Sequence, residues 1–344
     1  MESFLHRKVS SMKQSIIGGL AVAAALALVG GATAPTASAS PAHDQAIGED
    51  CEAPANARVI KGTSKWADPN TLTRRQAAAR EARGRRILAR SGIQTGGRPN
   101  GAVKIRVHFH GVTDRAGHGF VTKSRFKRQI KVLNKAYAGR TGPKAVNTPF
   151  RFRLASIDRT KNTRWYNANP AKKRGIKIHR KMQRALHIGD ARDLNIYTVG
   201  MGPLGVLGYA RFPASYRKFP KLDGVVLLSG TLPGGITSGG PGLVYNQGDT
   251  ATHEVGHWLN LYHTFQSSCS KLNDYVTDTP AQIAGPNIFV CDPGLDTCRP
   301  QGVRSRDPVR NFMNYTDDPC LNQFTWGQRD RMNSAWYLRQ VLSR

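Results

Sequence analysis

The chain has 344 residues, a formal net charge of +29 and five cysteines. Its length exceeds the common size of one domain, and such a basic excess favours contact with polyanions. The basic residues are nevertheless spread along the chain and no recognisable nucleic-acid module accompanies them, so composition predicts no specific nucleic-acid partner. The charge indicates a highly soluble surface that can make non-specific polyanion contacts.

Residues 1–39 have the pattern of a secretory signal peptide. Arg7, Lys8 and Lys13 precede an apolar run over residues 16–29, and residues 37–39 (ASA) fit a small-residue cleavage site. The apolar run is interrupted by glycine and is shorter than the roughly 20 residues that a spanning helix needs. We therefore predict a secreted, extracellular product without a transmembrane anchor after processing.

Residues 40–100 show little strand pattern. Residues 74–90 are rich in Ala and Arg, which favours a helix, and a glycine-rich basic stretch follows. This composition predicts a pro-segment with a cleavable basic end. The alternative is an N-terminal extension that stays attached to the domain.

Residues 101–344 are predicted to form the main domain. Alternating or continuous apolar patterns indicate strands, whereas helical spacing indicates helices between them. The predicted strands are 102–112, 150–157, 194–199 and 224–228, and the predicted helices are 124–137 and 176–186. Strands alternating with helices predict a mixed α/β fold.

A histidine motif follows within a further predicted helix, with Asp249 as its N-cap. His253 and His257 are four residues apart, so a helix places both imidazoles on one face, where they can bind a common zinc ion. Glu254 is adjacent and can reach a metal-bound water as general base. His263 would point away from that face if the helix continued, at 100° per residue. The helix must therefore end first, and Asn260 tolerates the left-handed turn required.

The sequence HEVGHWLNLYHTF, residues 253–265, resembles the extended zinc motif of the metzincins, and specifically that of the pappalysin-like (M43) peptidases. Asn260 replaces the glycine of the family pattern. Further segments resemble members of this family, so that the similarity extends from about residue 102 to the end. These segments are 148–152 (TPFRF), 194–197 (LNIY), 274–280 (DYVTDTP), 311–315 (NFMNY) and 320–325 (CLNQFT).

The resemblance implies an α/β metzincin-like fold. An N-terminal subdomain would carry a twisted mixed sheet and the zinc-binding active-site helix, and an irregular C-terminal subdomain would be linked by disulfides. Met313 would form the apolar floor beneath the metal, and Tyr315 would hydrogen-bond the developing oxyanion. Spacing leaves three pairings open for the four clustered cysteines. The resemblance implies the pairs Cys269–Cys298 and Cys291–Cys320.

Calcium is a second cofactor that the resemblance implies, with Asp274 and Thr279 as candidate ligands. A metal-free Asx-type turn is the alternative there. Asp317 and Asp318 follow the Met-turn closely, and they either make the specificity pocket acidic or are solvated loop residues. Cys51 is a candidate latency switch, because its thiolate could occupy the open zinc position; an intermolecular disulfide or an unused thiol are the alternatives.

His108 and His110 share one strand face, but no third ligand is evident, so structural or solvent-facing roles are expected.

The function predicted is hydrolysis of internal peptide bonds in protein or peptide substrates by a secreted zinc endopeptidase. Two other classes stay open at this point. One is a basic binding protein with a structural zinc, which would make salt-sensitive polyanion binding the main activity. The other is a zinc hydrolase that acts on a non-peptide bond.

Overall fold

The computed structural model describes residues 57–59, 72–201, 205–236, 242–302 and 305–344. All of these belong to one compact unit, Glu49–Arg344. The predicted signal peptide, residues 1–39, and Cys51 lie outside the described residues.

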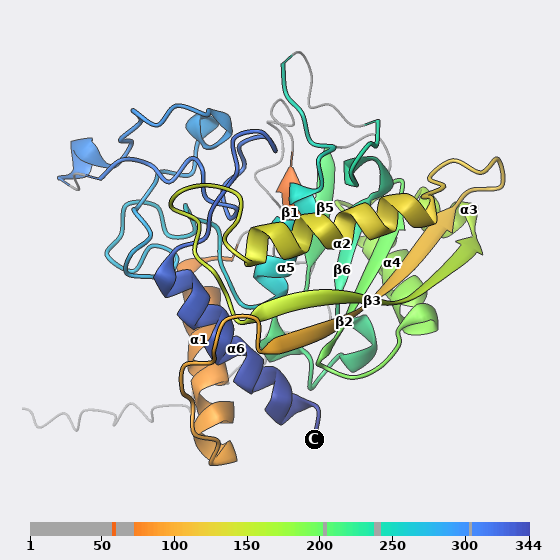
Figure 1. The fold of residues 1–344 in the computed structure, drawn as a ribbon, viewed down its shortest axis with the longest axis horizontal. Coiled ribbons are helices and arrows are strands. Elements are labelled where there is room, and N and C mark those ends of the chain that lie inside the picture. Colours follow the sequence, from red (N-terminus) through yellow and green to blue (C-terminus); the bar gives the residue numbers. More distant parts are fainter. Residues whose placement is uncertain (1–56, 60–71, 202–204, 237–241, 303–304) are drawn as a thin grey trace, which may run out of the picture. The chain divides into compact units, whose positions relative to one another are not determined.

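A six-stranded mixed sheet organises this unit (Figure 1). Its strands are β1 (Ala57–Val59), β2 (Val103–Thr113), β3 (Phe150–Lys161), β4 (Asp193–Val199), β5 (Val206–Ala210) and β6 (Val225–Leu228). Their spatial order is β1-β5-β6-β4-β2-β3. Strands β3, β2, β4 and β6 run parallel, whereas β5 pairs antiparallel with β6, and β1 pairs antiparallel with β5. The four predicted strands are confirmed, and β1 and β5 were not predicted.

Six α-helices have described bounds in this part of the chain. They are α1 (Arg74–Ser91), α2 (Lys123–Tyr137), α3 (Thr163–Tyr166), α4 (Lys173–Leu186), α5 (Asp249–Trp258) and α6 (Trp326–Leu342). Short 3₁₀ turns are η2 (Pro213–Ser215), η3 (Pro220–Leu222), η4 (Ser229–Thr231), η5 (Pro286–Phe289) and η6 (Arg299–Gln301). The helix α6 was missed, although Thr325 and Gln328 form the capping box that marks its start.

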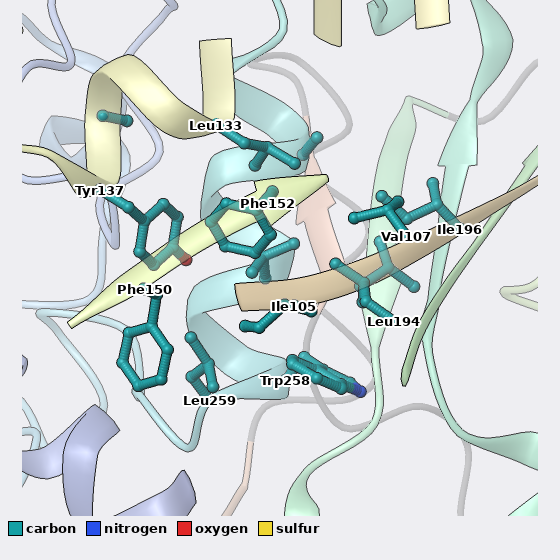
Figure 2. Close-up of a cluster of buried hydrophobic side chains, with 14 of the residues drawn as sticks. Ile105, Val107, Leu133, Tyr137, Phe150, Phe152, Leu194, Ile196, Trp258 and Leu259 are labelled. Atoms are coloured by element: carbon teal, nitrogen blue, oxygen red, sulfur yellow. The ribbon is translucent and has the colours of Figure 1, made fainter. Parts of the chain in front are cut away.

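The main hydrophobic core lies where the sheet meets α2 and α5 (Figure 2). The strands β2 and β4 contribute aliphatic side chains, and the end of α5 contributes Trp258 and Leu259, all of them buried. On these two strands, the aliphatic side chains that Figure 2 labels are Ile105, Val107, Leu194 and Ile196. Because residues i and i+2 of a strand share a face, the alternation in β2 presents Ile105 and Val107 together to this core. The core therefore fixes α5 against the sheet.

The chain from Leu259 to Thr325 is irregular, as the resemblance implies. Within its described residues it has short 3₁₀ turns and no α-helix. Two disulfides link this region, Cys269–Cys298 and Cys291–Cys320, with Cα–Cα distances of 5.4 and 5.9 Å. These are the pairs that the resemblance implies. Cross-links of this kind stabilise a region with little regular structure by restricting its unfolded chain.

A buried ion pair fastens α6 to the end of α5. The Arg339 guanidinium lies 2.9 Å from Asp223 Oδ2 and donates to the Trp258 carbonyl at 2.8 Å. Asp223 also accepts a hydrogen bond from the Trp258 indole at 2.8 Å. Both charged side chains are almost fully buried, so each depends on the other for compensation.

Replacing Arg339 by methionine is expected to lower the free energy of unfolding by about 3 to 5 kcal/mol, because Asp223 is left as an unpaired buried charge. Urea denaturation followed by tryptophan fluorescence measures this change. The matched control is Arg344→Met at the exposed C-terminus, which should change stability by less than about 0.5 kcal/mol. Equal losses in the two variants would contradict the structural role of the ion pair.

Candidate active site

The helix α5 carries the histidine motif and begins one residue earlier than predicted. Its N-cap is Gly248 at φ 101°, so the prediction of Asp249 as N-cap was wrong, and Asp249 is the first helical residue. The positive φ favours glycine there. The Asp318 carboxylate accepts from the backbone N–H groups of Gln247 and Gly248 at 2.8 and 3.2 Å. The same carboxylate lies 3.4 Å from the N–H of Asp249, so a side chain distant in sequence accepts from the first helical residue.

The turn after α5 is confirmed. Asn260 has φ 72°, in the left-handed region, and the Leu261 N–H donates back to the Gly256 carbonyl at 2.9 Å. This reversal brings His263 to the same point as His253 and His257. The Nε2 atom of His257 lies 3.0 Å from that of His253 and 3.1 Å from that of His263.

The protonation of the three imidazoles fits a metal site. The Nδ1 atoms of His253 and His257 lie 2.7 Å from the Phe312 and Leu261 carbonyls, so both must donate there. In a neutral imidazole the lone pair then resides on Nε2. Burial lowers the pKa of His257 to about 3 and holds the pKa values of His253 and His263 well below their ordinary range. Three buried imidazoles whose Nε2 atoms converge form a donor set that suits zinc.

Glu254 lies beside this cluster and is fully buried. Its Oε1 atom accepts a hydrogen bond from the Arg58 backbone N–H at 3.1 Å. On its other side is Gly208 of β5, where an added Cβ would meet Glu254 Cγ at 2.9 Å. The glycine therefore permits β5 to pass directly over the glutamate.

Met313 and Tyr315 flank the histidines from the predicted Met-turn. Met313 is buried against α5, since a Cβ at Gly256 would lie 2.5 Å from Met313 Sδ. The Tyr315 ring packs against His263, with centroids 4.8 Å apart, and its centroid is 5.8 Å from that of His253. The structure thus brings both residues to the histidine cluster.

A buried ion pair adjoins the cluster. Asp318 is buried and pairs with the Arg58 guanidinium at 2.9 Å. The guanidinium also donates to Thr250 Oγ1 at 3.0 Å and to the Thr316 carbonyl at 2.6 Å. Because Asp318 is buried, the interpretation of Asp318 as a solvated loop residue was wrong. Asp317 is only half-buried, and its carboxylate accepts from the Val244 N–H at 3.4 Å.

Arg58 and Thr250 are partners in this buried group that sequence analysis missed. Thr250 stands on α5 close to the histidine motif, and its position there was the available signal. Arg58 lies far from the motif in sequence, and one arginine among many basic residues gave no signal.

Asp274 and Thr279, the candidate calcium ligands, lie together away from the histidines. Asp274 is buried, and its Oδ1 atom accepts from the Val276 N–H at 3.0 Å. Burial raises the pKa of Asp274 to about 8. Among the described residues, Asp274 Oδ2 has no hydrogen-bond partner of ordinary length.

His108 and His110 have protein partners. His108 Nδ1 lies 2.7 Å from Ser156 Oγ, and His110 contacts Asp158 and Asn195 at 2.6 and 2.9 Å. In the part of the chain that the structure describes, neither joins a group of three metal-ligating side chains. The expected structural role agrees with these contacts.

Comparisons with known proteins agree with this arrangement. The family model described as pregnancy-associated plasma protein-A matches residues 242–336. An extracellular metalloprotease of Colletotrichum graminicola is 39% identical over 240 residues, which cover 68% of this chain and 77% of that relative. Another, of Podospora anserina, is 35% identical over 318 residues, covering 90% of this chain and 96% of the relative.

Solved structures from Tannerella forsythia share the fold. A promirolysin mutant matches with a TM-score of 0.59 at 25% identity, covering 79% of this chain and 92% of that one. Mature mirolysin in complex with a cleaved peptide matches with a TM-score of 0.55 at 26% identity, covering 72% of this chain and 100% of that one. The metzincin-like fold is therefore confirmed. From its histidine cluster, its sheet and these relatives, this chain belongs to the pappalysin-like (M43) family of metalloendopeptidases.

Proposed function

We propose that the chain is a secreted zinc endopeptidase whose metal is held by His253, His257 and His263. The observation that carries this proposal is the convergence of the three Nε2 atoms beside the buried carboxylate of Glu254. The Nδ1 contacts to backbone carbonyls support the role of each Nε2 as a ligand atom.

Glu254 acts as the general base in this proposal. A zinc ion bound at the histidines supplies a Lewis acid that polarises the attacked carbonyl and acidifies water. Glu254 takes a proton from the attacking water and passes it to the leaving nitrogen. Glu254 Oε1 accepts from a backbone N–H at 3.1 Å. This contact supports the proton transfer from Glu254 to the leaving group, because a backbone nitrogen receives the proton in that step. Tyr315 donates to the developing oxyanion, and Met313 supports the histidines from below.

We propose that the site prefers a basic residue directly after the scissile bond. The buried surroundings of Asp318 support this preference, since they already hold an arginine side chain through three hydrogen bonds. A guanidinium in a buried pocket requires such compensation.

Asp318→Asn is expected to lower kcat/KM for peptides with arginine after the scissile bond. Removing one partner of a buried charge pair costs about 2 to 5 kcal/mol, or roughly 30- to 4,000-fold. Paired peptides with arginine or leucine at that position measure the effect, and their ratio within one variant cancels any loss of folded enzyme. Asp317→Asn is the matched control and should keep the wild-type ratio. An unchanged ratio in Asp318→Asn would remove Asp318 as the specificity residue.

Asp274 and Thr279 are proposed as ligands of a calcium ion. A buried carboxylate with one oxygen lacking a protein partner is the type of donor that calcium prefers. The proposal predicts that calcium raises the melting temperature of the wild type and not that of Asp274→Asn. Equal responses in both proteins would contradict it.

Secretion is also part of the proposal. It is supported by the signal-peptide pattern of residues 1–39 and by relatives that are named extracellular metalloproteases. Within the described residues, no helix has both the length and the apolar character to cross a membrane.

Non-specific contact with polyanions is a further part of the proposal. It is supported by the exposed basic side chains of α4, which are Lys173, Arg174, Lys177, Lys181 and Arg184.

The test of the proposed function combines metal analysis with proteolysis. The purified secreted protein should contain about one zinc per chain at the histidine site and should cut casein at internal bonds. Mass spectrometry of the products distinguishes internal cuts from removal of terminal residues. A zinc-loaded, folded protein that leaves casein and peptide libraries intact would contradict the assignment as an endopeptidase.

A further inference from the structure

A cavity lies where the parallel strands β2 and β3 end. Its volume is about 510 Å³, and it is lined by Arg115, Lys161, Asn162, Thr163 and Arg164. Figure 1 shows α3 beyond the tips of the β2 and β3 arrows, well apart from α5. In open α/β sheets, the carboxyl ends of parallel strands are a common place for ligand sites. Since none of the zinc-site histidines lines this cavity, it is separate from the candidate active site.

Hydrogen bonds hold the walls of the cavity together. The Asn162 N–H donates to the Thr113 carbonyl at 2.7 Å, which joins the two strand ends. The Arg115 N–H donates to Thr163 Oγ1 at 3.0 Å, which ties the turn after β2 to the start of α3. Gly119 lies in the same connection at φ 83°, and a Cβ there would collide with a ring of α3. The backbone of the fold therefore sets the shape of the cavity.

Three of the five lining residues are cations, and none is an acid. Arg115, Lys161 and Arg164 are exposed, and within the described residues none of them forms an ion pair. The acid next to Arg115 is Asp114, whose carboxylate pairs with His118 at 2.7 Å. Like charges around one cavity repel each other, and an anion between them offsets this repulsion. The cavity therefore favours a negatively charged ligand.

The other polar groups of the cavity add donors. Asn162 Oδ1 accepts the Trp165 N–H at 3.0 Å, and Thr163 Oγ1 accepts the Arg115 N–H. The Asn162 amide protons and the Thr163 hydroxyl proton therefore face a ligand as donors, and guanidinium and ammonium groups have no acceptor. Such a set selects a group whose oxygens accept hydrogen bonds. The planar fork of arginine matches phosphate or sulfate oxygens in this way.

The size of the cavity favours an ester over a free ion. Small organic ligands commonly occupy cavities of roughly 300–1,000 Å³, and the volume of about 510 Å³ lies in that range. None of the five lining side chains is aromatic, whereas single-stranded nucleic acid is usually bound by stacking its bases on aromatic rings. The amide and hydroxyl donors suit sugar hydroxyls instead.

We propose that this cavity is a second binding site, which takes the phosphate or sulfate group of a sugar ester. The three cations contact the anionic oxygens, and Asn162 and Thr163 donate to the sugar. The proposal is independent of the peptidase function, because no lining residue belongs to the histidine cluster. Binding involves no covalent step. Because the cations are exposed, the affinity should fall as the salt concentration rises. The site allows the protein to attach to phosphorylated or sulfated carbohydrate.

The first test measures the binding of a glucose phosphate ester and a glucose sulfate ester by isothermal titration calorimetry at constant ionic strength. We expect both esters to bind, inorganic phosphate and sulfate to bind more weakly, and glucose not to bind. Tighter binding of the free ions would overturn the assignment to an ester. Tighter binding of thymidine monophosphate would overturn the assignment to a sugar. Absence of binding by every anion up to about 10 mM would overturn the site itself.

The second test asks whether the cavity holds the anion. Replacing all three cavity cations by alanine should weaken binding of the glucose phosphate ester by at least about tenfold, since one charge-assisted hydrogen bond contributes roughly that factor. The matched control removes the same charge elsewhere, by alanine at three exposed cations of α4, which are Lys177, Lys181 and Arg184. It should bind the ester as the wild type does.

Equal losses in the two triple variants would show general attraction by the basic surface and would overturn the site. The melting temperature of each variant without ligand checks its folding, and the exposed positions predict little change. The single variant Arg164→Gln gives the same comparison if the triple cavity variant is unstable. A folded Arg164→Gln protein that binds the ester with wild-type affinity would remove Arg164 from the proposed site.

Discussion

Replacing Glu254 by alanine is expected to reduce kcat on casein-derived peptides by up to about 10⁴-fold, the upper range for loss of a positioned general base. The histidines keep their geometry, since their Nδ1 atoms are held by the Phe312 and Leu261 carbonyls and not by the glutamate. Zinc content should therefore stay near that of the wild type. Single-turnover kinetics together with metal analysis measure the two quantities on one sample.

The isosteric Glu254→Gln variant separates proton transfer from packing. Its amide oxygen can still accept the N–H of a bound peptide, but the amide cannot take up a proton, so turnover should be lost as in Glu254→Ala. Glu81→Gln serves as the control among the glutamates, because Glu81 supports the contact between α1 and α6. It should lower stability and leave kcat of the folded enzyme unchanged. Near-normal rates in Glu254→Gln would show that another group is the base.

Replacing His257 by alanine is expected to abolish both metal binding and hydrolysis. His257 Nε2 is the central member of the cluster, with contacts of 3.0 and 3.1 Å to the other two Nε2 atoms. Zinc affinity should fall by more than about 100-fold, since even losing a hydrogen bond to a metal-bound histidine costs up to that factor. Competition with a zinc-sensitive chelator measures the affinity.

The matched control for this variant is His118→Ala. His118 is exposed and pairs with Asp114 at 2.7 Å, far from the cluster in sequence. Its replacement should leave zinc affinity and casein hydrolysis unchanged. The variant His257→Ala should also lose the increase in melting temperature that zinc gives the wild type, because only the native site binds the ion. Full zinc affinity in His257→Ala would contradict the ligand set.

The local parts of the site could be predicted from the sequence because they depend on short-range geometry. The spacing of His253 and His257 requires only a helix, and the position of His263 requires only a turn that Asn260 can form. Asn260 adopts the expected positive φ. The apolar alternation of β2 and the helical spacing of α2 are likewise local patterns, and both elements were predicted.

The strand β5 could not be predicted, because its pattern is weak and its role depends on neighbours. A glycine in a strand interior lowers the intrinsic preference for a strand. Gly208 is nevertheless required where Glu254 approaches the backbone. That requirement exists only once α5 has packed beneath the sheet.

The sequence by itself determined the metal-binding histidine spacing, the turn that completes it and the alternating α/β elements, since each depends on residues a few positions apart. Only the tertiary structure decided that Asp318 is buried in an ion pair with Arg58, 260 residues away, and that α1 belongs to the folded domain. The physical reason is that a buried carboxylate needs a compensating partner charge, and neither the burial nor the partner is encoded locally.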